Sequence, residues 1–271
     1  MTEKLINREL AILASGGWGT INPHSVSAAA ALAGYVGAEY GLLCHSADSA
    51  YEALIRQFGA AHGDAIIAGE ISIPSDSLIA LITGAKTVFA PVCERCGMIR
   101  QKGLAALLAE NENVKCVVLD IVPEGLEEYK LDKVFAITRE YGVGLILNAG
   151  GAFSAKWNGI PLVRLCDAVL YSCEEGSEIF CVKGGFIATD AEPVYAGAFA
   201  YHNCGRSFGE GCSLDIDGIV GGDFRVTEFT AVIAEEILET GSFSVPVPGK
   251  REKMKDQPVF SSDYAKKMTG N

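Results

Sequence analysis

Short apolar runs alternate with amphipathic stretches along most of the chain, and the runs are bounded by glycine, proline or polar residues. Apolar runs of about four or five residues are typical of buried strands, whereas amphipathic stretches of about ten residues are typical of helices. We predict strands over residues 41–44, 64–68, 87–91, 116–119, 144–147, 168–171 and 185–188. We predict helices over residues 24–36, 49–58, 77–83, 104–110, 131–141 and 227–240. The alternation of the two patterns predicts an α/β domain with a mainly parallel sheet.

The pattern also suggests where this domain begins and ends. A chain of 271 residues with 49% hydrophobic residues is large enough to bury one sizeable core. We expect a short N-terminal arm over residues 1–14 and one large domain over residues 15–240. Residues 241–271 are polar, lysine-rich and without periodicity, so we expect an extended or partly disordered tail.

Charge and cysteine content narrow the classes of partner. The formal net charge is −12, which argues against nucleic acid or an anionic membrane as the main partner. The N-terminus is charged and no apolar run approaches the length of a membrane span, so we expect neither a signal peptide nor a membrane segment. Several of the nine cysteines lie inside apolar runs, as small buried hydrophobes do. We therefore expect free thiols and a cytoplasmic protein.

Cys93 and Cys96 form a C-x-x-C motif, for which there are three interpretations. The pair can be structural thiols, a redox couple that closes a disulfide, or half of a metal site. A metal site needs two more ligands, and Cys204 and Cys212 are the loop-like candidates for them. Structural thiols are the favoured reading.

Two further groups can carry chemistry. Cys173 is followed by Glu174 and Glu175, but a nucleophilic cysteine needs a histidine partner and the sequence pairs none with it. His45 follows a predicted strand at its carboxyl end, where α/β folds place their sites, and a capping or packing role is favoured for it.

Five ordered segments carry a resemblance to a known family. They are SGGWGTINPHSVSAAAALAGYVGAEYGLLC, HGDAIIAGEISIPSDSLIALITGAKTVFAPV, CDAVLYSCEEGSEIFCVKGGFIATD, YHNCGR and GGDFRVTEFTAVIAEEIL. Together they resemble the DegT/DnrJ/StrS sugar aminotransferases over residues 15–238. The resemblance implies a three-layer α/β/α large domain of the aspartate aminotransferase type, without the small C-terminal domain that usually follows. It also implies a site built for pyridoxal phosphate at a dimer interface.

Several residues depart from the pattern of that site. Ser177 falls at the position of the lysine that forms the imine with pyridoxal phosphate, and a serine has no amine for this reaction. Asn148 stands at the position of the carboxylate that keeps the pyridine nitrogen protonated. Ile71 and Ile73 are the candidates for the position of the stacking aromatic.

The segments that hold the cofactor phosphate differ in charge. Ser46 and Asp48 stand in the family's cradle at a helix start, where Asp48 would repel a dianion. Ser172 keeps a cradle hydroxyl and Arg225 keeps its place, whereas Asp223 replaces a neutral asparagine. Lys183 lies six residues after the vacant lysine position and is the candidate substitute for the imine lysine, although a solvent-facing lysine in a turn is the favoured interpretation.

Three hypotheses follow from the resemblance. The leading one is a non-catalytic subunit without cofactor, which forms a homodimer or a heterodimer with a lysine-containing paralogue that aminates a keto-sugar or keto-cyclitol. The second is an active aminotransferase on a sugar nucleotide or related ketone, with pyridoxal phosphate on Lys183. The third is a repurposed pocket that works without a cofactor.

Overall fold

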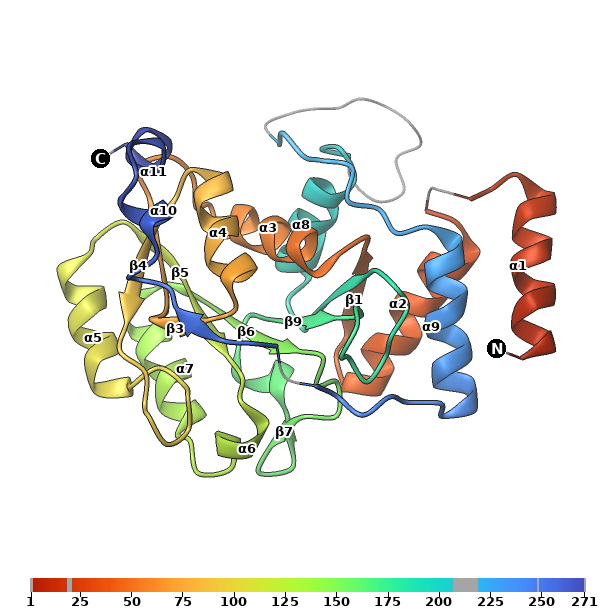
Figure 1. Cartoon of the computed structure of the whole chain (residues 1–271), viewed down its shortest axis with the longest axis horizontal. Coiled ribbons are helices and arrows are strands. Elements are labelled where there is room, and N and C mark those ends of the chain that lie inside the picture. Colours follow the sequence, from red (N-terminus) through yellow and green to blue (C-terminus); the bar gives the residue numbers. More distant parts are fainter. Residues whose placement is uncertain (1, 19–20, 207–218, 248, 271) are drawn as a thin grey trace.

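The computed structural model describes residues 2–18, 21–206, 219–247 and 249–270, with the backbone alone for residues 74–77. Cys212, one of the two candidate extra metal ligands, lies outside the described residues. The described chain forms a central sheet covered on both faces by helices (Figure 1). This arrangement confirms the predicted three-layer α/β/α fold with a mainly parallel sheet.

The central sheet has seven strands in the order β1-β10-β9-β6-β5-β2-β4. Strands β9, β6, β5, β2 and β4 are mutually parallel, and β10 is antiparallel to both of its neighbours. The strands of this sheet are β1 (Tyr40–Cys44), β2 (Ala65–Gly69), β4 (Lys86–Ala90), β5 (Val114–Asp120), β6 (Gly144–Gly150), β9 (Ala168–Ser172) and β10 (Gly185–Thr189). Short pairs complete the strands: β3 (Ile71–Ser72) with β11 (Glu252–Lys253), and β7 (Lys156–Trp157) with β8 (Ile160–Pro161).

Successive residues of each strand point to opposite faces of the sheet, and both faces are buried. In β6, for example, Leu147 packs on one side and Ile146 on the other. The first face is covered by α2 (Pro23–Val36), α5 (Gln101–Glu110), α7 (Leu131–Tyr141) and α9 (Glu228–Thr240). The second face is covered by α3 (Ala47–Gln57), α4 (Pro74–Thr83) and α8 (Glu192–His202). Burial of both faces explains why the strands read as continuous apolar runs.

The N-terminal arm is helical. Helix α1 (Glu3–Ser15) packs on α9 through Leu5 and Ile12, and Arg8 forms an ion pair with Glu235 of α9. It lies at the far end of the molecule from the C-terminus (Figure 1). The expected arm is therefore a docked helix.

The segment after α9 runs back across the molecule. Residues 242–247 and 249–251 form no regular element, and the chain then forms β11, α10 (Pro258–Ser261) and α11 (Asp263–Thr269), the last beside α4 (Figure 1). Met254 is buried in this segment, and the ring of Phe260 packs edge-on against that of Phe89. The expected extended tail thus includes folded elements that pack on the domain, because its few apolar residues find partners far away in the sequence.

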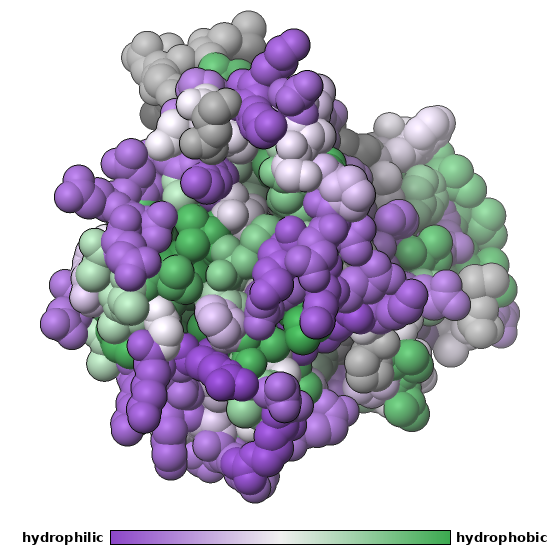
Figure 2. Space-filling view, turned by 60° about the vertical axis from the view of Figure 1, so that its left-hand side comes forward, coloured by the Kyte–Doolittle hydropathy of each residue, from purple (hydrophilic) through white to green (hydrophobic). Residues whose placement is uncertain are grey.

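Two short elements complete the fold: helix α6 (Pro123–Leu126) and the 3-10 helix η1 (Leu162–Leu165). Seen from the side of α5 and β4, hydrophilic side chains cover most of the surface, with hydrophobic ones gathered between them (Figure 2). In the described part of the chain, no helix has both the length and the apolar character needed to cross a membrane.

Candidate functional site

A cavity of about 290 Å³ lies at the carboxyl ends of β5, β6 and β9. Ligands of open α/β sheets bind at this edge, because loops from several parallel strands meet there. Four residues singled out from the sequence line the cavity together: Ile73, Asn148, Ser172 and Ser177. The topology therefore brings these positions to one place although they are far apart along the chain.

The floor of the cavity is a pair of polar side chains on adjacent strands. Asn148 donates from Nδ2 to Asp120 Oδ1 at 3.0 Å, and its Oδ1 accepts the Gly150 N–H at 3.2 Å. Asp120 Oδ2 also accepts the Ser72 hydroxyl at 2.7 Å. Sequence reasoning missed Asp120, although its position at the last residue of a buried strand is a usable signal.

Ser177 closes one wall of the cavity. Its side chain is buried, and its N–H donates to the Glu174 carbonyl at 3.1 Å. A Cβ at Gly151 would stand 2.5 Å from Ser177 Cα, so the two loops touch where a larger residue has no room. Ser177 thus offers a hydroxyl, in a tightly packed wall, at the position where the resemblance implies a lysine.

The start of helix α3, whose residues do not line the cavity, is occupied by the chain's own carboxylate. Ser46 caps the helix, and the next N–H, that of Ala47, points to Glu174 Oε1 at 3.4 Å. Lys183 Nζ forms an ion pair with Glu174 Oε2 at 3.1 Å, and its side chain is mostly exposed. Asp48 adds a second carboxylate in the first turn of the helix. The positive end of α3 is therefore compensated from within the chain.

Gly185 makes the close approach behind this helix start possible. A Cβ at Gly185 would stand 2.2 Å from the Ser46 carbonyl oxygen. Strand β10 can lie against the α3 N-terminus because position 185 carries no side chain. Ser172, at the end of the neighbouring strand, accepts the Glu174 N–H at 3.2 Å and so fixes the loop that carries this carboxylate.

Arg225 and Asp223 lie outside this cavity. They form a two-point ion pair with N–O distances of 2.8 and 2.9 Å, and these hydrogen bonds lower the pKa of Asp223 and raise that of Arg225. Arg225 lines a different cavity, of about 490 Å³, between α2, β1 and α8. There it stands beside His202, whose pKa is lowered to about 4, first by burial and then by the charge of Arg225. The structure thus separates Arg225 from Asn148 and Ser177.

The C-terminal segment forms the remaining wall. Pro246, Val247, Gly249 and Arg251 line the cavity, and the Val247 N–H donates to the Gly176 carbonyl at 2.8 Å. The Arg251 guanidinium donates to the Gly97 carbonyl at 2.8 Å, to the Ile71 carbonyl at 2.7 Å and to Asp120 Oδ2 at 3.3 Å. No sequence signal points to Arg251, because it lies in a segment without periodicity and its partners are remote.

The other candidates from the sequence lack the surroundings of a nucleophile. Cys173 is fully buried, and its hydrogen bond with Cys181 and its burial raise its pKa well above the usual range. His45 is exposed, with its ring 6.1 Å from that of Phe224. Across the described ranges, no group of three or more His, Cys, Asp or Glu side chains, Cys93 and Cys96 included, is placed to hold a metal ion.

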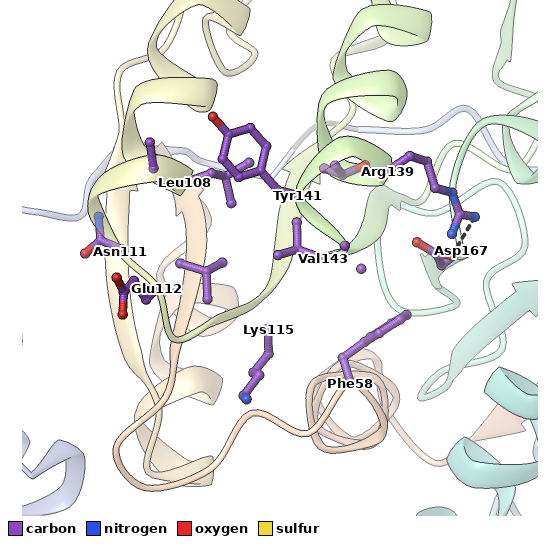
Figure 3. Close-up of a pocket in the computed structure, with 14 residues that line it drawn as sticks. Phe58, Leu108, Asn111, Glu112, Lys115, Arg139, Tyr141, Val143 and Asp167 are labelled. Carbon is purple, nitrogen blue, oxygen red and sulfur yellow. Dashed lines mark ion pairs between the residues drawn. The ribbon is translucent and has the colours of Figure 1, made fainter.

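A larger hollow, of about 770 Å³, lies at the opposite end of the strands (Figure 3). Lys115 and Val143 border it where β5 and β6 begin, and Arg139 pairs with Asp167 across its rim at 2.8 Å. It is an open groove at the amino ends of the strands, away from the polar residues of the first cavity. We therefore place the candidate site at the carboxyl ends of the strands. The smaller cavity there gathers the polar side chains, whereas the larger hollow at the amino ends does not contain them.

Comparison with known proteins gives a consistent result. Residues 1–244 match the DegT/DnrJ/EryC1/StrS aminotransferase family. The chain is 26% identical over 203 residues to 3-amino-5-hydroxybenzoate synthase of Amycolatopsis mediterranei, covering 74% of this chain and 51% of the relative. The crystal structure of 3-amino-5-hydroxybenzoic acid synthase matches with a TM-score of 0.79 and 24% identity, over 88% of this chain and 62% of the other. NtdA from Bacillus subtilis, solved with bound cofactor PMP, matches with a TM-score of 0.75 and 17% identity, over 88% and 52%. The chain therefore spans about half of the length of this curated relative.

Proposed function

Because the chain belongs to the DegT/DnrJ/EryC1/StrS aminotransferase family, we propose that it is a non-catalytic member that keeps the large-domain scaffold and does not hold pyridoxal phosphate. In this proposal it pairs with a lysine-containing paralogue, and the paralogue aminates a keto-sugar or keto-cyclitol. The observation that carries the proposal is the Glu174 carboxylate at the N-terminus of α3.

A helix N-terminus binds phosphate through free N–H groups and the helix dipole. Here Glu174 already points at the Ala47 N–H, and Asp48 stands in the same first turn. A unit negative charge about 4 Å from a carboxylate costs roughly 4 kcal/mol at an effective dielectric constant of about 20. The 290 Å³ cavity, which neither Asp48 nor Glu174 lines, is acidic as well: Asp120, Glu124 and Glu175 stand against one guanidinium, that of Arg251. A dianionic phosphate is therefore disfavoured on charge.

The remaining contacts of the cofactor are also missing from the cavity. Ser177 has no amine, and Lys183 is paired with Glu174 and does not line the cavity. Asn148 can hydrogen-bond to a pyridine nitrogen but cannot hold a proton there by charge. Ile73 faces the cavity with an aliphatic side chain, which has no π-face to stack on a ring. The residues present do not fit pyridoxal phosphate.

The partner part of the proposal is supported by exposed hydrophobic side chains at one end of the molecule. Large clusters of this kind on a soluble protein are typical of interaction surfaces. They lie on α1, on α2 and on the connection between these helices: Ile6, Leu10, Leu13, Trp18, Val26 and Tyr35. We infer that this surface, here called the α1–α2 surface, contacts the partner subunit.

A spectroscopic experiment tests the cofactor part. The purified protein is incubated with pyridoxal phosphate, treated with borohydride and mapped by peptide mass spectrometry. We expect no aldimine absorption band and no pyridoxyl group on Lys183 in the wild type. The Lys183→Arg variant should show the same absorption spectrum as the wild type. An aldimine band that disappears in Lys183→Arg, with the label on Lys183 in the wild type, would show an active aminotransferase and overturn the proposal.

Co-expression tests the partner part separately. The chain is produced with a lysine-containing family member from the same genome, and the complex is weighed by native mass spectrometry. We expect a stoichiometric heteromer that is lost when both Leu10 and Leu13 are changed to Asp. Ile82→Asp is the matched control, because Ile82 is 54% exposed on α4, outside this surface, against 55% for Leu10 and 52% for Leu13. A homodimer alone in the presence of every such partner would contradict this part and leave the cofactor result standing.

A further inference from the structure

Cys93 and Cys96 lie in a tight turn between β4 and α5, outside the site described above. The turn is closed by two backbone hydrogen bonds: Gly97 N–H donates to the Cys93 carbonyl at 2.7 Å, and Cys93 N–H donates to the Met98 carbonyl at 2.8 Å. Arg251 holds the same turn through the Gly97 carbonyl. Two cysteines three positions apart in such a turn have their Cα atoms within the range that a disulfide bridges.

The two sulfur atoms have different surroundings. The backbone N–H groups of Cys96 and Arg95 and the Cys96 thiol stabilise the Cys93 thiolate, and they lower the pKa of Cys93. Partial burial raises the pKa of Cys96. Cys93 therefore loses its proton more readily than Cys96. Thiol–disulfide exchange uses this difference, because the thiolate attacks first and the second thiol resolves the mixed disulfide.

The other thiols with a shifted pKa contrast with this pair. They are fully buried: burial raises the pKa of Cys44, Cys116 and Cys166, and a hydrogen bond with Cys181 together with burial raises that of Cys173. A thiol of that kind is inert toward reagents in solution.

The turn opens on a surface hollow of about 550 Å³. Its charged lining residues are Arg95, Arg100, Lys102 and Lys130 against Glu94 and Glu128. On a protein with a net charge of −12, this is a locally basic surface beside a reactive thiol. It favours an approaching disulfide that carries carboxylates.

We propose that Cys93 and Cys96 form a reversible dithiol–disulfide site that exchanges with a carboxylate-bearing low-molecular-weight disulfide. The Cys93 thiolate attacks one sulfur of the external disulfide, forms a mixed disulfide and releases the other half as a thiolate. Cys96 then loses its proton and attacks the Cys93 sulfur, and the second half leaves as a thiol. Two protein thiols are oxidised to one disulfide, and the external disulfide is reduced to two thiols.

Oxidised and reduced glutathione are the probe, and trypsin makes the product easy to recognise. Arg95 lies between the two cysteines, so trypsin releases peptides 87–95 and 96–100, which stay joined only when the disulfide is present. The protein is equilibrated at a series of glutathione ratios, alkylated and digested. We expect the joined pair in oxidised buffer and its disappearance in reduced buffer.

Three variants identify the order of attack. Cys96→Ser should accumulate glutathione on position 93, whereas Cys93→Ser should leave Cys96 largely unmodified. Cys204→Ser is the matched control for a half-buried cysteine elsewhere and should leave the joined pair unchanged. Absence of the joined pair at every ratio, or a pair that reduced glutathione does not open, overturns the proposal. Equal modification of position 96 in Cys93→Ser also overturns it, because the attack would then not depend on Cys93.

Discussion

Arg251 is the anchor of the C-terminal segment, and its replacement by alanine tests whether that segment is held as the structure indicates. The guanidinium makes three hydrogen bonds, to the carbonyls of Gly97 and Ile71 and to the Asp120 carboxylate. Its side chain is 22% exposed. In Arg251→Ala all three bonds disappear. Strand β11, which begins at the next residue and pairs with β3, then loses the anchor directly before it.

The expected loss can be worked out from these contacts. Hydrogen bonds that involve a charged group contribute about 1.5–3 kcal/mol each, so a simple sum exceeds 4 kcal/mol. The sum is too large here, because the two carbonyls regain water when the segment lifts. Asp120 also keeps its bonds from Ser72 and Asn148. We expect about 2 kcal/mol for the docking of the segment, which corresponds to a roughly 30-fold change in its opening equilibrium. The free energy of global unfolding should change less, because the segment can leave before the domain unfolds.

Amide hydrogen exchange is the assay. The Met254 N–H donates to the Glu70 carbonyl at 2.9 Å and reports on the docked state. We expect its exchange to accelerate roughly 30-fold in Arg251→Ala and by an intermediate factor in Arg251→Lys, which keeps the charge without the planar fork. Lys250→Ala is the matched control, because this neighbouring side chain is 87% exposed. Unchanged exchange at Met254 in Arg251→Ala, or an equal effect in Lys250→Ala, would refute the reasoning.

Three further predictions concern packing, acid stability and the N-terminal helix. Gly151→Ala should destabilise the fold by about 1–3 kcal/mol, because its Cβ would meet backbone at 2.5 Å. By contrast, Gly103→Ala inside α5, whose nearest neighbour is at 3.9 Å, should stabilise it by about 0.5–1 kcal/mol; thermal denaturation compares the two. His202 has a folded pKa of about 4 against 6.5 when unfolded, so the unfolded chain binds a proton that the folded one lacks as the pH falls from 6.5 to 4. Over that range the wild type should lose about 3 kcal/mol relative to His202→Gln in urea titrations. Arg8→Ala should cost about 2 kcal/mol in the same titrations, because it leaves the largely buried Glu235 carboxylate without this partner.

Each of these has a clear contrary result. Equal melting temperatures for the two glycine variants would show that the loops at the cavity wall can move apart. A pH-independent difference in unfolding free energy between the wild type and His202→Gln would show that His202 takes up its proton in the folded chain over the same pH range as in the unfolded chain. An unchanged unfolding free energy in Arg8→Ala would show that α1 is not docked through this ion pair.

Much of the fold follows from the sequence, and the exceptions have physical reasons. The prediction of a helix over residues 131–141 coincides with α7, because that stretch has one apolar side and a glycine after its last residue. Helix α8 was not predicted, because its small and aromatic residues are apolar nearly all round and show no amphipathic period. The predicted strand over residues 144–147 continues to Gly150, since polar Asn148 pairs with Asp120 instead of ending the strand.

The candidate site was predictable where its residues lie on strands or on the loops that directly follow them. Asn148, Ser172 and Ser177 meet because parallel strands place their carboxyl ends side by side. Arg225 was grouped with them from the resemblance, and the structure places it at another cavity. Arg251 could not be predicted from the sequence, because its contact with Asp120 spans 131 positions and no local pattern encodes it.

The C-terminal segment has a consequence for how this cavity can be compared across relatives. The family match ends at residue 244, and Pro246, Val247, Gly249 and Arg251 follow it. One wall of the cavity is therefore made by a stretch that has no counterpart in the family match. The shape and charge of the cavity therefore depend partly on residues that the family match does not cover, Arg251 above all. A comparison of ligand preferences with relatives has to include this segment as well as the shared strands.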